Sequence, residues 1–135
     1  MIKSQIKKIR VEKLVDHLLS RGYITLSRKY SKYLPPPQPI YGYDVDVVAK
    51  YDEPKFNHFR YERKVAIGIT LSDEDLNNPA LLDKLIQLTK VHSKYNRKVT
   101  VFVGVPGNQI IKADMLISTL DEEVKNKIKL IPLSE

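Results

Sequence analysis

Two aspartates lie two residues apart in the apolar stretch YGYDVDVVAK, which covers residues 41–50. Aspartate is depleted in β-strands, so Asp44 and Asp46 need an explanation if this stretch is a strand. Side chains alternate across a strand, and the two carboxylates would therefore share one face. Carboxylates in this position are either hydrated or compensated by a cation, and a hard divalent ion such as Mg²⁺ accepts ligands of this type.

Glu62 and Lys64 show the same spacing in the segment YERK. If residues 40–50 and 59–71 form a hairpin that is symmetric about residue 55, position 46 lies opposite position 64, to within two residues. The acids and the lysine would then converge on neighbouring strands. A simpler interpretation pairs Glu62 and Lys64 with neighbouring arginines as ordinary surface charges and leaves Asp44 in water.

The N-terminal segment adds a further acid. Residues 4–20 have helical spacing, and we expect Leu14, Val15, Leu18 and Leu19 to form the buried stripe. On a helical wheel Glu12 falls about 20° from Leu19, at the rim of that stripe, so it could reach the sheet. Alternatively, Glu12 balances neighbouring lysines along a hydrated helix edge.

The remaining pattern alternates between strands and helices. Ser72 with Asp75 resembles a capping box, and Asn78 followed by Pro79 is typical of a helix start. Pro132 places the last strand at a sheet edge. We expect a single α/β domain over residues 1–135, with a mixed central sheet flanked by helices in the order α-β-β-β-α-β-α-β. The expected segments are helix 4–20, strands 23–30, 40–50 and 59–71, a turn at 52–58, helix 72–96, strand 98–105, helices 109–118 and 120–127, and strand 128–133.

The amino-acid composition and the residue spacing exclude several classes of functional site. The chain has no cysteine, which excludes disulfides, thiolate zinc sites and cysteine nucleophiles. Its glycines form no phosphate-cradling loop, so we expect no nucleotide cofactor. The histidines lack metal-ligand spacing. No apolar run approaches the roughly 18–20 residues that span a bilayer, so we expect a cytoplasmic protein without a membrane partner.

The net positive charge comes from the first half of the chain. Residues 1–64 contain 14 Lys and Arg against 7 Asp and Glu, whereas residues 65–135 contain 9 of each. A one-sided positive field attracts polyanions, and we expect DNA as the partner, although a merely solubilising lysine surface would look similar. Aromatic residues between the basic ones could stack on bases; they are Tyr30, Tyr33, Tyr41 and Phe59. The candidate nucleic-acid-binding residues are Arg28, Lys29, Lys32, Arg60 and Arg63.

These motifs resemble a known family. The helix and strand of VEKLVDHLLSRGY, the segments YDVDVV and ERK, and a later helix followed by VTVFVGV are similar to the restriction-endonuclease-like nucleases, and most similar in layout to archaeal Holliday-junction resolvases. The resemblance covers roughly residues 5–106. It implies a Mg²⁺-dependent endonuclease for branched DNA that works as a homodimer. The catalytic residues would be Asp46, Glu62, Lys64 and Glu12, with Asp46 and Glu62 as metal ligands and Lys64 orienting the attacking water.

One departure from the family pattern leaves two registers open. The apolar run VAIGITL, residues 65–71, follows the acid-x-Lys motif instead of preceding it. If burial sets the register, Gly68 and Thr70 occupy the motif positions and the site is inactive. The alternative functions are then a catalytically inactive DNA-binding module or a protein-interaction module.

Overall fold

The computed structural model describes residues 3–55, 60–91 and 98–134, of which 53–55, 60–62 and 98 are described by their backbone alone. Within these ranges, no helix is long and apolar enough to cross a membrane. The elements in chain order are α1 (Lys3–Ser20), β1 (Ile24–Arg28), β2 (Val47–Lys55), β3 (Arg60–Thr70), α2 (Asp73–Leu76), α3 (Leu81–Thr89), β4 (Lys98–Pro106), a 3₁₀ turn (Gly107–Gln109), α4 (Ile110–Ile117), α5 (Glu122–Lys125) and β5 (Ile128–Leu133).

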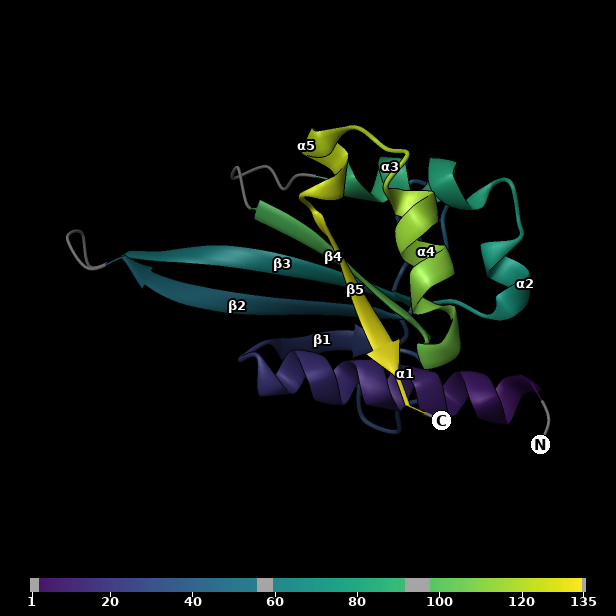
Figure 1. The fold of residues 1–135 in the computed structure, drawn as a ribbon. Helices are drawn as coiled ribbons and strands as arrows, with labels where there is room; N and C mark the ends of the chain where they lie inside the picture. Colours follow the sequence, from purple (N-terminus) through teal and green to yellow (C-terminus); the bar gives the residue numbers. More distant parts are fainter. Residues whose placement is uncertain (1–2, 56–59, 92–97, 135) are drawn as a thin grey trace.

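The five strands form one mixed sheet in the order β1-β2-β3-β4-β5. The first three strands are antiparallel, and β3, β4 and β5 are parallel to one another. Figure 1 shows α1 along one face of the sheet and α3 and α4 on the other. The expected mixed sheet flanked by helices is confirmed, and so is the edge position of the strand that contains Pro132.

The buried stripe of α1 differs from the expected one. Val11, Leu14 and Leu18 are fully buried against the sheet, whereas the side chain of Leu19 is 64% exposed. Spacings of three and four residues keep these three side chains on one face. Glu12 is two residues from Leu14, about 200° around the helix, and is exposed to solvent. The predicted approach of Glu12 to the sheet is therefore wrong.

The pairing of β2 with β3 decides between the two registers. Val47 pairs with Gly68, and the amide of Asp46 donates to the carbonyl of Gly68 at 2.9 Å. Continuing this register places Asp46 level with Ile69, five positions beyond the expected Lys64. The hairpin symmetric about residue 55 is therefore wrong and the burial-based register is confirmed. The physical reason is that Ala66, Ile67, Gly68 and Ile69 are all buried between the helical layers.

The hairpin is also longer than expected. β2 begins at Val47 instead of residue 40 and continues to Lys55, through part of the predicted turn at 52–58. β1 pairs with β2 only as far as Lys50, and β4 pairs with β3 only from Lys64 onward. The outer part of the hairpin is thus a two-stranded ribbon that extends beyond the sheet (Figure 1). Phe59 and the rest of the segment 56–59 lie outside the described residues.

The helix boundaries after β3 agree only in part with those predicted from the sequence. The capping box is confirmed, since the Asp75 amide donates to Ser72 Oγ and the Ser72 amide donates to Asp75 Oδ2. It caps the short α2, and Asn78 Oδ1 then accepts from the Ala80 amide at 2.9 Å before α3 begins at Leu81. α3 ends at Thr89, not at the predicted residue 96, and residues 92–97 lie outside the described part.

Candidate functional site

The carboxylate of Asp46 is the centre of a cluster of hydrogen-bond donors. Its side chain is buried, with 2% of the residue exposed. Oδ2 accepts from the Thr70 amide at 2.7 Å, from Thr70 Oγ1 at 3.0 Å and from Lys7 Nζ at 3.0 Å. Lys29 Nζ lies 3.3 Å from Oδ1. Both carboxylate oxygens are therefore satisfied by the protein itself.

Helix α1 supplies Lys7 to this cluster. Lys7 lies four residues before Val11, on the same helix face as the buried Leu14 and Leu18, but one turn beyond the apolar stripe. Its Nζ also donates to the Thr70 carbonyl at 3.1 Å. The helix thus places an ammonium group at the point where β3 ends.

The connection between β1 and β2 supplies Lys29. The backbone amide of Lys29 donates to the Asp46 carbonyl at 3.0 Å, which holds the two chain segments side by side. Its ammonium group pairs with the exposed Asp44 as well as with Asp46. Asp44 and Asp46 precede β2 instead of lying within it, and both pair with the same lysine.

Opposing effects set the pKa of Asp46. Burial alone would raise the pKa of this carboxyl, but the charge and hydrogen bond of Lys7, the Thr70 amide and the charge of Lys29 outweigh burial. The net pKa of Asp46 lies below the ordinary aspartate value. At neutral pH the carboxylate is therefore a charged partner for two lysines.

A cavity of about 260 Å³ opens beside Asp46, at the carboxyl end of β3. Lys84 of α3 reaches this cavity, and burial is the main reason why its pKa is lowered. The lining residues are Lys7, Tyr43, Asp44, Asp46, Thr70, Leu71, Asp75, Asn78, Ala80, Leu81 and Lys84. Polar and apolar surface contribute about equally to the cavity, and lysines on two helices, Lys7 and Lys84, face the same group of carboxylates.

The other predicted catalytic residues lie far from Asp46. Glu62 pairs with Glu53 in the ladder, seven positions before Ile69, which is roughly 23 Å along the strand. Lys64 pairs with Tyr51, roughly 16 Å from the same level. Glu12 is exposed on the outer side of α1. The structure therefore does not bring Asp46, Glu62, Lys64 and Glu12 together.

Gly68 and Thr70 stand where the acid-x-Lys motif was sought. A Cβ atom at Gly68 would lie 3.0 Å from Leu14 Cδ2 and 3.2 Å from Val47 Cβ, so the packing of α1 leaves no room for a carboxylate there. No group of three or more His, Cys, Asp or Glu residues among the described side chains could hold a metal ion. With ammonium groups on both oxygens of Asp46, these residues do not fit Mg²⁺.

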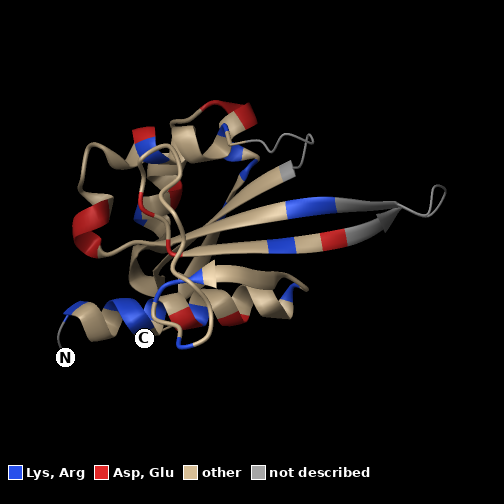
Figure 2. Ribbon diagram, turned by 180° about the vertical axis from the view of Figure 1, so that it is seen from behind, with Lys and Arg blue, Asp and Glu red and all other residues tan. Residues whose placement is uncertain are grey.

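The candidate nucleic-acid-binding residues fall into two places. Arg28, Lys29 and Lys32 lie at the β1 end of the connection to β2, which crosses in front of the sheet in Figure 2. Lys32 is exposed, and Arg28 Nε donates to the Lys29 carbonyl at 3.2 Å. Arg63 lies on the hairpin and pairs with Asp52 at 2.9 Å. Arg60 is described by its backbone alone.

Lys7 and Lys84 were missed in the sequence, and Thr70 was named only as the occupant of a motif position and not as a donor to Asp46. Lys7 could have been found, because positions 7, 11, 14 and 18 continue one helical stripe and a lysine within it faces the sheet. Lys84 lies three residues after Leu81 and one before Leu85, both of them buried residues of α3. Thr70 gave no comparable signal, since its role follows from the register alone.

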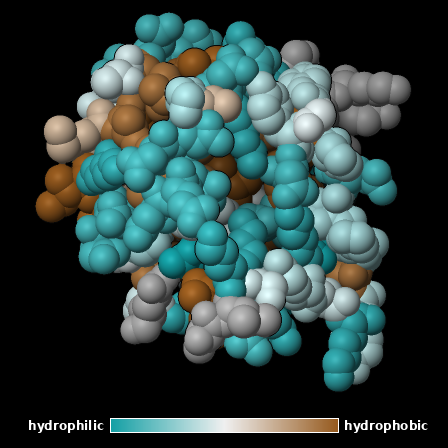
Figure 3. Space-filling model, turned by 90° about the vertical axis from the view of Figure 1, so that its right-hand side faces the viewer, coloured by the Kyte–Doolittle hydropathy of each residue, from teal (hydrophilic) through white to brown (hydrophobic). Residues whose placement is uncertain are grey.

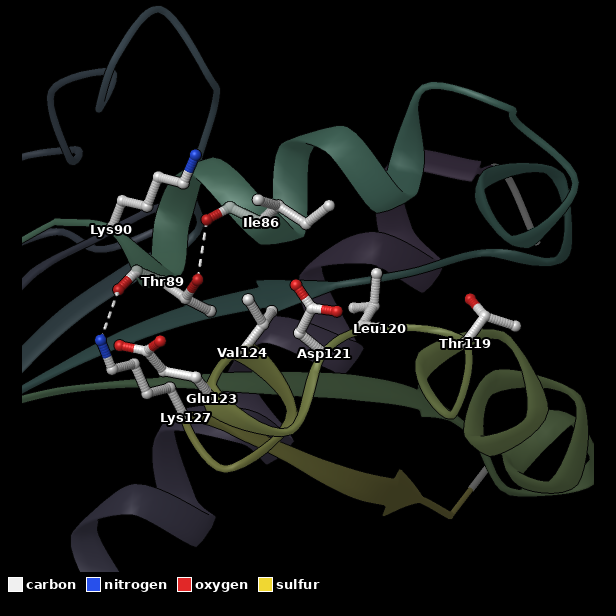
Figure 4. A pocket seen from close by; sticks show the side chains of 9 residues that line it. All are labelled: Ile86, Thr89, Lys90, Thr119, Leu120, Asp121, Glu123, Val124 and Lys127. Carbon is white, nitrogen blue, oxygen red and sulfur yellow. Dashed lines mark hydrogen bonds between the residues drawn. The ribbon is translucent and has the colours of Figure 1, made fainter.

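A second cavity, of about 440 Å³, lies between α3 and α5 (Figure 4). Lys127 Nζ approaches the Thr89 carbonyl at 3.5 Å, and Thr89 Oγ1 donates to the Ile86 carbonyl at 2.7 Å. The two acids of the lining, Asp121 and Glu123, balance its two lysines. The lining of this cavity has no net charge and no buried acid, so it indicates no class of ligand.

Comparison with known proteins assigns the chain to no family. No family model, no curated protein and no solved structure matches the chain.

Proposed function

We propose that this chain is a DNA-binding protein with a restriction-endonuclease-like fold, in which a lysine-neutralised aspartate replaces the nuclease centre. The proposal accounts for the order of strands, for the place of Asp46 and for the uneven distribution of charge. It retains the DNA partner suggested by the sequence and rejects Mg²⁺-dependent cleavage.

The fold assignment rests on topology. A helix packed on an antiparallel β1-β2-β3 sheet, followed by a helical crossover to the parallel β4, is the arrangement that the resemblance implies. Asp46 lies directly before β2, the strand on which the resemblance places an aspartate. Helix α3, which lies between β3 and β4 in the chain, is on the opposite face of the sheet from α1 (Figure 1).

The observation that carries the non-catalytic part is the donor set on Asp46. A catalytic metal needs free carboxylate oxygens, yet Lys7, Lys29 and Thr70 already occupy those of Asp46. Lys7 stands on the helix from which the family supplies a glutamate. Two ammonium groups provide the charge compensation that a divalent ion would otherwise provide.

DNA binding is supported by the charge distribution. All of the net charge of +7 comes from residues 1–64, which include α1, β1, β2, their connections and the start of β3. The side of the molecule that carries α2 and the N-terminal end of α1 is largely hydrophilic (Figure 3). The acids of α2 lie on that side, so it is the excess positive charge of residues 1–64, and not this hydrophilic side, that suits the protein to contacts with phosphates.

A combined binding and cleavage assay tests the proposal. The full chain is mixed with a four-way DNA junction and with a linear duplex, once in EDTA and once in Mg²⁺. We expect salt-sensitive complexes in both buffers and intact DNA in both. Nicked junctions that require Mg²⁺ and disappear with Asp46→Asn would overturn the non-catalytic assignment. Absence of salt-sensitive binding to either DNA would overturn the DNA-binding assignment.

A further inference from the structure

We infer that the connection between β1 and β2 binds unpaired DNA bases by stacking them on exposed tyrosines. We call residues 29–46 the tyrosine loop. This inference rests on the proposed DNA binding and specifies which form of DNA the protein prefers. It concerns a surface beside the Asp46 cluster and needs no catalysis.

The tyrosine loop displays three aromatic rings to solvent. Tyr33 is 93% exposed, Tyr41 60% and Tyr30 45%. A tyrosine that packs in a core hides its ring, so burial does not explain these three residues. Lys32 is exposed between two of them, which places a phosphate-binding charge next to the rings.

Backbone hydrogen bonds hold this loop in shape. The Arg28 amide donates to the Pro35 carbonyl at 3.0 Å, and the hydroxyl of Ser31 accepts from the amides of Tyr33 and Leu34 at 3.2 and 3.0 Å. The amide of Lys29, at the start of the loop, donates to the carbonyl of Asp46, at its end. The rings are therefore presented on a fixed backbone, which lowers the entropic cost of binding.

The backbone at Tyr41 is strained in a way that packing does not explain. Ile40 and Tyr43 exchange two backbone hydrogen bonds of 2.9 Å around Tyr41 and Gly42, whose φ angles are 51° and 80°. A two-residue turn with two positive φ angles favours Asn, Asp or Gly at the first position. Tyr30 has φ 61°, and these two tyrosines are the non-glycine residues with positive φ in the described part of the chain.

Residues with backbone strain of this kind cluster at functional sites. Asparagine at position 41 would suit the turn better, but it would remove the ring. Retaining tyrosine makes sense if the ring contacts a ligand, and a flat aromatic ring beside lysine matches a nucleotide: the base stacks and the phosphate pairs with the charge. Bases within a duplex are stacked on one another, so this surface selects unpaired ones.

The test compares single-stranded with double-stranded DNA. Anisotropy titrations in EDTA use a thymidine oligonucleotide of about 16 nucleotides and a duplex of the same length. We expect wild type to favour the single strand. Tyr33→Ala combined with Tyr41→Asn should lose about tenfold or more in affinity for the single strand, with the duplex affinity changed less than about twofold. Tyr33→Phe combined with Tyr41→Phe keeps the rings and should bind as wild type does.

Thermal unfolding separates lost contacts from lost structure. Tyr41→Asn should melt at a higher temperature than wild type, because it relieves the turn, while binding the single strand more weakly. Met115→Ala removes another exposed apolar side chain, on α4, and should leave single-strand affinity unchanged. Single-strand affinity that survives loss of both rings would overturn the inference and leave the proposed DNA binding standing. Failure to bind any DNA would overturn both.

Discussion

At the scale of single residues, the chemistry of this protein is decided by what surrounds Asp46. The same carboxylate could serve as a metal ligand or as the anion of a buried ion pair. Lys7 at 3.0 Å, Lys29 at 3.3 Å and two donors of Thr70 select the ion pair. The three residues that supply these donors come from three different segments, so the cluster joins α1, the tyrosine loop and the end of β3.

Asp46→Asn should destabilise the fold at neutral pH by about 2–3 kcal/mol, because it leaves two lysines without their buried counter-charge. The pKa of Asp46 is lower in the folded chain than the unfolded aspartate value of about 3.9, so folding releases the proton. Its contribution is therefore complete above pH 4–5 and is lost as pH falls from there through the depressed folded pKa.

Urea unfolding at several pH values checks this prediction. Wild type should lose stability steeply below about pH 4, and Asp46→Asn should show a shallower acid limb. Asp44→Asn is the matched control, since Asp44 shares Lys29 but is exposed, and should cost less than about 1 kcal/mol. Equal losses for the two variants would contradict a central role for Asp46.

At the scale of elements, the close packing of α1 on β3 fixes what the site can contain. Gly68 lies directly under Leu14, and Thr70 follows two residues later to meet Asp46. The helix could not pack this closely on a larger side chain. The close contact between Leu14 and Gly68 therefore excludes an acidic side chain at position 68, where the nuclease motif would need its second acid.

Gly68→Ala should destabilise the protein by about 1–3 kcal/mol, because the new methyl group would press on Leu14 and on the Cβ atom of Val47. Gly107→Ala is the matched control: its nearest contact, the Leu133 carbonyl oxygen, lies at an ordinary 3.7 Å. Chemical denaturation of both variants measures the difference. A Gly68→Ala protein as stable as the control would contradict the register of β2 and β3.

Much of the element order could be predicted from sequence, because buried helices and strands carry local periodicity. The stripe of α1, the buried strand from Val99 to Val105 and the capping box at Ser72 are of this kind. The register of β2 with β3 was harder. Residues 51–55 and 60–63 form a ribbon beyond the rest of the sheet and lack the apolar alternation that marks a half-buried strand, so residues 52–55 were predicted as part of a turn.

The candidate site was predictable only in part. Asp46 stood out because it interrupts an apolar run, and its burial confirms that it is not a solvated surface acid. Glu12 was misplaced because the cluster of leucines at 18–19 suggested a different helix face. Glu62 and Lys64 were misplaced by the register. Pairings between distant segments, such as Lys7 with Asp46, depend on tertiary packing and leave little trace in local sequence.

At the scale of the whole molecule, acidic and basic residues are distributed unevenly over the surface. The acidic residues of α2 lie beside the N-terminal end of α1, and Lys3 pairs with Glu74 at 2.8 Å. Part of the positive charge is therefore neutralised within the protein. Figure 2 shows further basic residues on α1, on the tyrosine loop and on the hairpin, which leaves a surface over which phosphates can be contacted.

The affinity for duplex DNA as a function of salt concentration tests the central claim most directly. Binding through phosphates releases counterions, so log K should fall linearly with log salt, with a slope of about −0.9 for each phosphate contacted. We expect a clear negative slope that Lys32→Gln makes shallower by about one unit, while Lys129→Gln, an equal loss of charge on β5, leaves it unchanged. An affinity that does not depend on salt, or equal effects of the two variants, would contradict the account.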